Sequence, residues 1–238
     1  MAFRNILITR QPEQSVDFVN LLSRNLFYPF LLPMIETSGL NFNVRKKVYD
    51  FIIFSSINAV KYFMDKSDAR AIKYIAVGSK TAEFLKNYGI DAIVPQGEFS
   101  ADGLINYFEN IDVKDKNILI PVPETHSDKL KNHLITYGAL VETVAIYKTS
   151  KIKYESGYVK NFIAENKIDT VVFASPSAAE SFFMNFHEDS FINKLNFISI
   201  GKTTYNFLKN SLNIDSYYPE EYTIYGVVLL LQELRRTK

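Results

Sequence analysis

A set of serine and threonine side chains follows the apolar segments of this sequence, at the places where we expect helices to begin. The set consists of Ser55, Ser56, Thr81, Ser175, Ser177, Thr203 and Thr204. The carboxyl ends of parallel strands share one edge of a sheet, and free N–H groups and positive helix dipole ends face that edge. Such an edge binds carboxylates or phosphates without many lysines. A single serine or threonine there more often only caps its helix. The prediction of a site therefore rests on the repetition of the set in both halves of the chain.

Two glycines, Gly78 and Gly201, end apolar segments beside this set and would allow a tight turn toward a ligand. The sequences around them, VGSKT and IGKTT, lack the spacing of a phosphate-binding P-loop. The chain also has neither a dinucleotide-binding glycine pattern nor the nucleophile elbow of a hydrolase. The glycines therefore favour an anion site built from helix ends over a nucleotide-binding loop.

Arg10 and Tyr147 are two further side chains that could do chemistry. Arg10 ends the first apolar segment and could hold a carboxylate through two parallel hydrogen bonds, although a plain surface arginine fits the pattern equally well. Tyr147 lies in the segment AIYKT, where a phenol could donate a proton to a leaving group. Because the chain has 15 tyrosines, the pattern alone favours a packing role for Tyr147.

The composition excludes several kinds of chemistry. The chain has no cysteine, which excludes disulfides, thiolate metal sites and thiol nucleophiles, and its three histidines lack zinc-site spacing. A net charge of +1 over 238 residues argues against nucleic acid as the main partner. No apolar run has the length of a signal peptide or a membrane span, so we expect a cytoplasmic protein without a membrane partner.

Short apolar segments rich in isoleucine, valine and phenylalanine alternate with helical patterns along the whole chain. These segments are residues 5–9, 51–55, 74–77, 117–120, 170–174 and 197–200. Uninterrupted apolar runs of this length are typical of parallel strands buried on both faces. Their alternation with helices indicates a doubly wound α/β architecture, whose sheet edges would bring the hydroxyl residues together.

The sequence also repeats itself. Residues 50–59 (DFIIFSSINA) match residues 169–178 (DTVVFASPSA), and residues 75–81 match residues 198–204. The tetrapeptide NILI opens both halves. Self-similarity of this kind indicates two related repeats. Their approximate limits are residues 1–111 and 112–238.

Two segments, residues 30–37 (FLLPMIET) and residues 141–149 (VETVAIYKT), break the rhythm of strands and helices. Both follow the first helix of a repeat, and both have the pattern of strands that are more alternating and more exposed than the others. We expect them to be linkers that cross between two domains.

The order and spacing of these motifs resemble the uroporphyrinogen-III synthase family over nearly the whole chain. The matching segments are ILITR (6–10), DFIIFSSINA (50–59), AVGSKTA (76–82), SADGL (100–104), VAIY (144–147), VVFASPSA (171–178) and SIGKTT (199–204). Each motif is unspecific alone, and the specificity lies in their order. The chain departs from the family at residues 121–125 (PVPET), where many relatives have an Arg-Gly turn.

The resemblance implies two similar parallel-sheet α/β domains joined by a two-stranded β ladder, with the function in the cleft between them. Domain 1 would combine residues 1–29 and 150–238, and domain 2 would span residues 38–140. Residues 30–37 and 141–149 would form the ladder.

The resemblance also implies an activity. Members of this family close hydroxymethylbilane, a linear tetrapyrrole with eight carboxylates, into a ring with loss of water and inversion of ring D through a spiro intermediate. No metal or organic cofactor takes part. Catalytic roles would fall to Tyr147 and Thr204. Substrate-binding roles would fall to Arg10, Ser55, Ser56, Gly78, Thr81, Ser175, Ser177, Gly201 and Thr203. We expect a monomer whose partner is this small polycarboxylate.

Two other functions fit parts of the pattern. A non-enzymatic binding module for small molecules could use the same two-domain closure. A flavodoxin-like regulatory domain would need acidic residues at strand ends, whereas Asp50 and Asp169 precede their strands. The family tyrosine and threonine positions, Tyr147 and Thr204, favour the enzyme.

Overall fold

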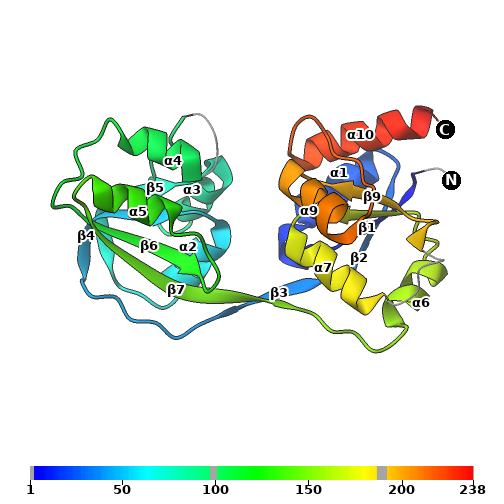
Figure 1. The fold of residues 1–238 in the computed structure, drawn as a ribbon, viewed down its shortest axis with the longest axis horizontal. Coiled ribbons are helices and arrows are strands. Elements are labelled where there is room, and N and C mark those ends of the chain that lie inside the picture. The colour runs from blue at the N-terminus through cyan, green and yellow to red at the C-terminus, as the bar shows by residue number, and fades with distance from the viewer. Residues whose placement is uncertain (1–2, 97–100, 187–191, 238) are drawn as a thin grey trace. The chain divides into compact units, whose positions relative to one another are not determined.

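The computed structural model describes residues 3–96, 101–186 and 192–237 of the chain. It divides into two compact units. Unit 1 consists of Met1–Glu36 and Ser150–Lys238, and unit 2 consists of Thr37–Thr149. Both chain ends belong to unit 1, so unit 2 is an insertion in the sequence of unit 1 (Figure 1).

Unit 1 is built on a four-stranded parallel sheet with the strand order β2-β1-β8-β9. The strands are β1 (Asn5–Ile8), β2 (Tyr28–Leu31), β8 (Thr170–Phe173) and β9 (Asn196–Ser199). Helices α1 (Val16–Arg24) and α10 (Ile224–Arg236) pack on one face, and α6 (Tyr158–Glu165), α7 (Pro176–Asn185) and α9 (Lys202–Leu212) pack on the other. The short 3-10 helix η1 (Pro12–Gln14) follows β1. Because helices cover both faces, the central strands have continuous apolar sequences.

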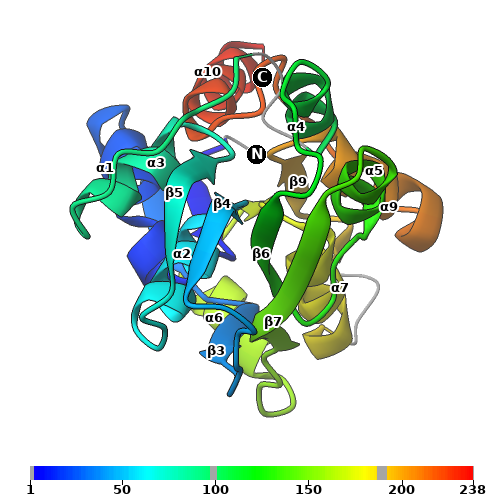
Figure 2. The same ribbon diagram turned by 90° about the vertical axis from the view of Figure 1, so that its left-hand side faces the viewer.

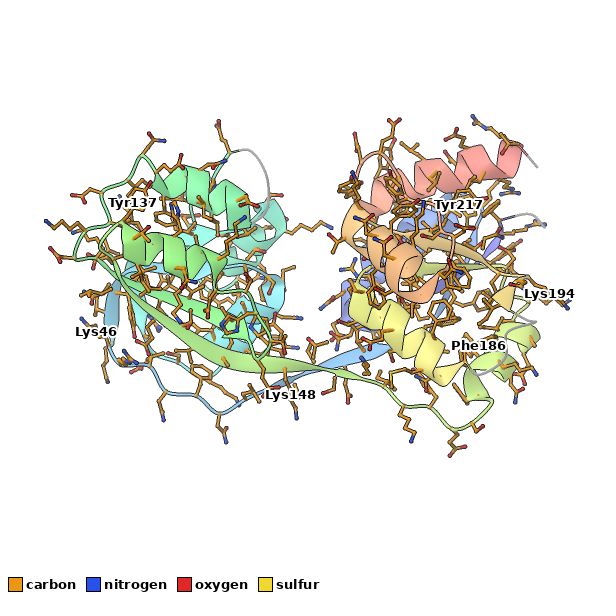
Figure 3. All side chains as sticks on the ribbon, viewed as in Figure 1. Lys46, Tyr137, Lys148, Phe186, Lys194 and Tyr217 are labelled. Atoms are coloured by element: carbon orange, nitrogen blue, oxygen red, sulfur yellow. The ribbon has the colours of Figure 1, made fainter. Side chains whose placement is uncertain are left out.

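Unit 2 has a five-stranded sheet with the order β3-β7-β6-β4-β5, and Figure 2 shows its strands β5, β4, β6 and β7 side by side. The strands are β3 (Ile35–Gly39), β4 (Val48–Phe54), β5 (Arg70–Ala76), β6 (Asn117–Pro123) and β7 (Leu140–Lys151). Helices α2 (Ile57–Met64) and α3 (Ser79–Lys86) pack on one face, and α4 (Ala101–Phe108) and α5 (Lys129–Thr136) pack on the other. In each unit, side chains fill the space between sheet and helices (Figure 3). The predicted fold class is confirmed.

Each compact unit combines strands from both sequence repeats. The matching segments 50–59 and 169–178 contain β4 of unit 2 and β8 of unit 1, and the two NILI segments form β1 of unit 1 and the start of β6 of unit 2. The strand orders β2-β1-β8-β9 and β7-β6-β4-β5 therefore correspond strand by strand. Each sequence repeat, 1–111 and 112–238, contributes strands to both units, an arrangement that we call the exchange of strands. The repeats therefore do not coincide with the compact units.

Strands β3 and β7 carry the chain between the units. Leu40 N donates to Ile146 O at 2.9 Å, and Ile152 N donates to Met34 O at 3.0 Å, so the two segments run antiparallel. Along the rest of its length β7 is a full member of the unit 2 sheet, where it pairs in parallel with β6.

The predicted linker strand at residues 30–37 is wrong as a single element. Its first part belongs to β2, which pairs with β1 in unit 1, and only its last part belongs to β3. Leu32 and Met34, between the two strands, are 5% and 0% exposed. These buried residues continue the apolar pattern through a break in the strand, which explains the error.

The segment 121–125 begins as strand rather than turn, because β6 extends to Pro123. Pairing of β6 with β4 ends at Leu119, while pairing with β7 continues through Pro121 and Pro123. A proline lacks the N–H that a strand donates to its neighbour, so it is tolerated where one side of the strand is unpaired.

In the part of the chain that the structure describes, no helix has the length and apolar character needed to cross a bilayer.

Candidate functional site

Apart from Tyr147, the predicted site residues all follow parallel strands at their carboxyl ends. In unit 2, Ser55 and Ser56 follow β4, and Gly78 and Thr81 follow the neighbouring strand β5. In unit 1, Arg10 follows β1, the two serines Ser175 and Ser177 follow β8, and Gly201, Thr203 and Thr204 follow β9. Because β1, β8 and β9 are consecutive in their sheet, the structure gathers each group on one edge. The residues predicted to be catalytic, Tyr147 and Thr204, belong to different units.

Tyr147 is the centre of the group in unit 2. It lies on β7 with 7% of its surface exposed, and its Oη is 3.4 Å from Ser56 Oγ. Its neighbour Lys148, labelled in Figure 3, is exposed. The structure thus brings together the predicted phenol and one predicted serine, although they are 91 residues apart in the sequence.

Ser56 caps helix α2 and contacts the phenol at the same time. Its Oγ accepts a hydrogen bond from Ala59 N at 3.1 Å. The 3.4 Å separation from Tyr147 Oη is longer than the usual O–H···O distance of about 2.8 Å. The contact places Ser56 Oγ beside the phenol oxygen, and either hydroxyl could be the donor.

Burial raises the pKa of the Tyr147 phenol above its ordinary value, the hydrogen bond with Ser56 acts in the opposite direction, and the neighbouring Tyr62 raises it again. A phenol with a raised pKa is fully protonated at neutral pH. Tyr147 can therefore act as a proton or hydrogen-bond donor, and it is a poor base.

The other predicted residues of unit 2 differ in their access to a ligand. Ser55 is exposed, whereas Thr81 is 5% exposed in the first turn of α3. Gly78 precedes α3 with φ +88°, a backbone conformation that side chains with a Cβ rarely adopt. This glycine therefore permits the tight turn from β5 into α3.

In unit 1, Ser175 repeats the cap of Ser56. Its Oγ accepts from Ala178 N at 3.2 Å, at the matching position of the other repeat. The capping interpretation thus holds for both serines. Ser177, one residue inside α7, is exposed.

Arg10 is a partly buried cation without a counter-ion. Its side chain makes no hydrogen bond, ion pair or ring contact with any residue in the described ranges. Burial lowers the pKa of its guanidinium below the ordinary value, yet an arginine stays charged in a protein. A desolvated, unpaired guanidinium at the carboxyl end of β1 is suited to a carboxylate ligand.

The start of α9 completes the group in unit 1. Thr204 is 3% exposed, and its hydroxyl has no hydrogen bond within the described part of the chain, whereas Thr203 is exposed. A Cβ built on Gly201 would lie 3.6 Å from the ring of Tyr222. The exposed Tyr222 ring therefore lies against the backbone that begins α9.

Two aromatic residues beside the site were not predicted. Tyr62 on α2 stacks on Tyr147, with ring centroids 5.5 Å apart and planes at 21°. In the sequence, Tyr62 lies one helical turn or less from the buried Ala59 and Phe63, so it has the appearance of a core residue. Tyr222 lies in a loop with no periodic pattern. The sequence feature that could have indicated Tyr62 is its position on α2, the helix that begins after the predicted site residue Ser56.

In residues 3–96, 101–186 and 192–237, no group of three or more histidine, aspartate or glutamate side chains could hold a metal ion. The predicted site residues at the two sheet edges supply a phenol, hydroxyls, a guanidinium and backbone N–H groups. These groups donate hydrogen bonds to anions and leaving groups.

Comparisons with known structures agree with this fold. A uroporphyrinogen-III synthetase crystal structure from Helicobacter pylori matches with a TM-score of 0.71 and 18% identity, covering 97% of this chain and 99% of that one. A mutant uroporphyrinogen III synthase from Thermus thermophilus matches with a TM-score of 0.59 and 15% identity, over 99% and 100% of the two chains. At these identities the likeness concerns the fold alone.

Sequence comparisons supply the family. A Methanocaldococcus jannaschii protein is 27% identical over 97% of this chain and 98% of its own length. The uroporphyrinogen-III synthase of Chlorobaculum parvum is 24% identical over 89% of this chain and 92% of its own length. The family model described as uroporphyrinogen-III synthase HemD matches residues 16–228. That match spans most of both units, and the chain belongs to the uroporphyrinogen-III synthase family.

Proposed function

We propose that this protein is a lyase that closes hydroxymethylbilane into uroporphyrinogen III, with loss of water and inversion of ring D. Membership of the family and the geometry at the two sheet edges support this proposal. The substrate is a flexible polyanion with a poor leaving group, so the enzyme must supply proton assistance at one point and anion binding at several others.

The observation that carries the proposal is the pairing of Tyr147 with Ser56 at the carboxyl edge of unit 2. Tyr147 Oη keeps its proton at neutral pH, and Ser56, fixed as the cap of α2, orients the phenol oxygen. A buried but oriented phenol of this kind can protonate a departing hydroxyl.

In the proposed reaction, Tyr147 gives one proton to the leaving hydroxyl and regains one proton at ring closure. The bond between the methylene carbon and the hydroxyl oxygen breaks, and the pyrrole nitrogen supplies an electron pair to the carbon. The hydroxyl leaves as water with the Tyr147 proton. Ring closure later releases one proton from a ring carbon, and this proton restores the phenol.

Unit 1 contributes anion binding in this proposal. Arg10 holds one carboxylate, while the first turns of α7 and α9, with Ser177 and Thr203, hold others through N–H and O–H groups. Thr204 adds a hydroxyl with no partner in the described ranges. On the unit 2 edge, Ser55, Gly78 and Thr81 serve the same substrate.

The decisive assay supplies enzymatically generated hydroxymethylbilane and separates the product isomers. Spontaneous closure gives the type I isomer, because inversion requires the enzyme. We expect the type III isomer in excess. A product containing type I alone would leave the protein as a non-enzymatic binding module.

Replacing Tyr147 with phenylalanine tests the proposed donor. Tyr147→Phe removes only the hydroxyl, so we expect kcat to fall by about 100-fold, within the range for loss of a general acid. The melting temperature should change by only a few degrees. The matched control is Tyr49→Phe, which removes a buried phenol at the other end of β4, where Tyr49 Oη donates to Glu142 at 2.6 Å. Equal effects of both variants on kcat would contradict the assignment.

We also propose that the enzyme is cytoplasmic. We propose that it acts as a monomer, since the reaction described above uses no residue from a second chain. Size-exclusion chromatography with light scattering should give the mass of one chain across the concentrations used in the assay. A stable dimer at those concentrations would contradict the monomer.

A further inference from the structure

The ring of Tyr147 is held by a second aromatic residue. Tyr62 stacks on it with a centroid distance of 5.5 Å and an interplanar angle of 21°. Ser56 and Tyr62 both belong to the α2 segment, Ser56 as the cap and Tyr62 six residues later. Helix α2 therefore contacts Tyr147 at two points, the hydroxyl and the ring face.

Tyr62 is itself fixed by strand β3. Its Oη donates to Thr37 O at 2.8 Å and lies 3.0 Å from Thr37 Oγ1. A Cβ built on Gly39 would lie 3.0 Å from Cδ1 of the Tyr62 ring, closer than most real contacts. Thr37 and Gly39 are two residues apart on β3 and so face the same side. One holds the Tyr62 hydroxyl, and the other makes room for its ring.

The orientation of a phenol ring decides where its proton points. Conjugation keeps the O–H bond in the plane of the ring, so a ring that tilts carries its proton direction with it. A stacked neighbour restricts that tilt. Because proton transfer depends steeply on alignment, a misplaced donor loses much of its effect.

From these contacts we infer that Tyr62 is a positioning residue for Tyr147: stacked on that ring and anchored to Thr37, it sets the plane in which Tyr147 presents its proton. The inference rests on the proposed function, because it gives Tyr62 a role only through the Tyr147 donor. Tyr62 contacts no reacting atom in this scheme.

The first test compares two substitutions of Tyr62. Tyr62→Leu removes the stacked ring and should lower kcat for the type III isomer by about 10- to 100-fold, with KM changed less than about twofold. Tyr62→Phe keeps the ring and loses only the Thr37 bond, so it should recover most of kcat. Phe42→Leu is the matched control, since Phe42 stacks on Phe63 at 5.9 Å in the same unit and makes no ring contact with Tyr147 within the described residues. The inference is wrong if Phe42→Leu lowers kcat as much as Tyr62→Leu.

A double-mutant cycle with Tyr147→Phe separates the inference from the proposed function. If Tyr62 acts through the Tyr147 hydroxyl, Tyr62→Leu should have no further effect on kcat once that hydroxyl is absent. A full additional loss in the Tyr147→Phe background would overturn the inference and leave the donor assignment intact. If Tyr147→Phe alone keeps full kcat, the proposed function of Tyr147 fails first. Circular dichroism and melting curves of all variants restrict the comparison to folded protein.

Discussion

At the scale of single residues, the proposed function gives Arg10 and Tyr147 different tasks on two matching sheet edges. Arg10 follows β1 in unit 1 and Tyr147 lies on β7 in unit 2, and neither has a counterpart of its own kind in the other unit. At the position that corresponds to Arg10, after the second NILI segment, the chain has Val122. The repeated fold thus supplies equivalent sheet edges, while single side chains give one edge a cation and the other a proton donor.

Replacing Arg10 should weaken substrate binding without weakening the fold. A hydrogen bond to a charged group contributes about 1.5–3 kcal/mol, so Arg10→Met should raise KM by about 10- to 100-fold. Because the guanidinium is desolvated and unpaired, its removal should leave the free energy of unfolding unchanged or higher. Steady-state kinetics and urea unfolding measure both. Arg24→Met, on the exposed face of α1, is the control. A loss of stability that matches the loss of activity would show that Arg10 is structural.

Asp50 gives the fold a predictable response to acid. It accepts a hydrogen bond from Asn117 N at 2.8 Å, and this bond, followed by the charge of Lys116, holds the pKa of its carboxyl below the ordinary value. A lowered pKa in the folded state means that the stabilisation is present above the unfolded value, about 3.9, and is lost as the pH falls through the folded value.

The variant Asp50→Asn keeps an acceptor for Asn117 N but cannot titrate. Between about pH 4.5 and pH 2.5 the free energy of unfolding should fall less steeply for Asp50→Asn than for the unmodified protein. Urea unfolding at a series of pH values measures the slope. Asp68→Asn is the control, because Asp68 is 75% exposed in its ion pair with Lys47. Identical slopes for the unmodified protein and Asp50→Asn would contradict this account.

At the scale of elements, the start of α2 has a structural role as a capped helix end, and the proposed function adds a chemical role. Ser56→Ala should cost about 1 kcal/mol of stability through the lost cap. It should also lower kcat by about two- to tenfold, because Tyr147 loses its hydroxyl partner. Thr223→Ala is the matched control, since Thr223 caps α10 by accepting from Gly226 N at 3.0 Å. The two variants should lose similar stability, and only Ser56→Ala should lose kcat. An unchanged kcat in Ser56→Ala would mean that Ser56 is only a cap.

The central elements could be predicted from the sequence because burial on both faces leaves a continuous apolar run. The predicted segments 5–9, 51–55 and 170–174 coincide with β1, β4 and β8 to within a few residues at each end. The peripheral elements were harder, because their burial does not follow strand periodicity. Strand β2 has a proline and partly exposed residues at the sheet edge, and the buried Leu32 and Met34 that follow it are outside any strand.

Part of the geometry of the candidate site could be predicted from the sequence. The hydroxyl residues at strand ends are where the repeat predicted them, because capping is a local property of the chain. The meeting of Tyr147 with Ser56 is a tertiary contact between β7 and α2, and no local pattern records it. Tyr62 was missed for the same reason, since its spacing on α2 fits a core residue as well as a stacking partner.

For the whole molecule, the exchange of strands predicts which fragments can fold. Unit 2 is one continuous stretch, Thr37–Thr149, that holds nearly all of its sheet and both of its apolar clusters. Expressed alone, it should unfold cooperatively in urea with native-like circular dichroism. The fragment 1–111, which has the start of one sheet and part of the other, should not. Cooperative unfolding of 1–111 alone would contradict the exchange.

The same insertion has a consequence for how the protein is made. Strand β1 is translated before unit 2, yet the backbone N–H groups of Arg4 and Asn5 at its start donate to the carboxylate of Asp169, about 165 residues further along. At roughly 5–20 residues per second, the nascent β1 waits on the order of ten seconds for β8. Translation completes unit 2 during that interval. A truncated mRNA that ends between β7 and β8 would therefore yield a complete unit 2 preceded by β1 and β2, whose apolar side chains would lack their packing partners.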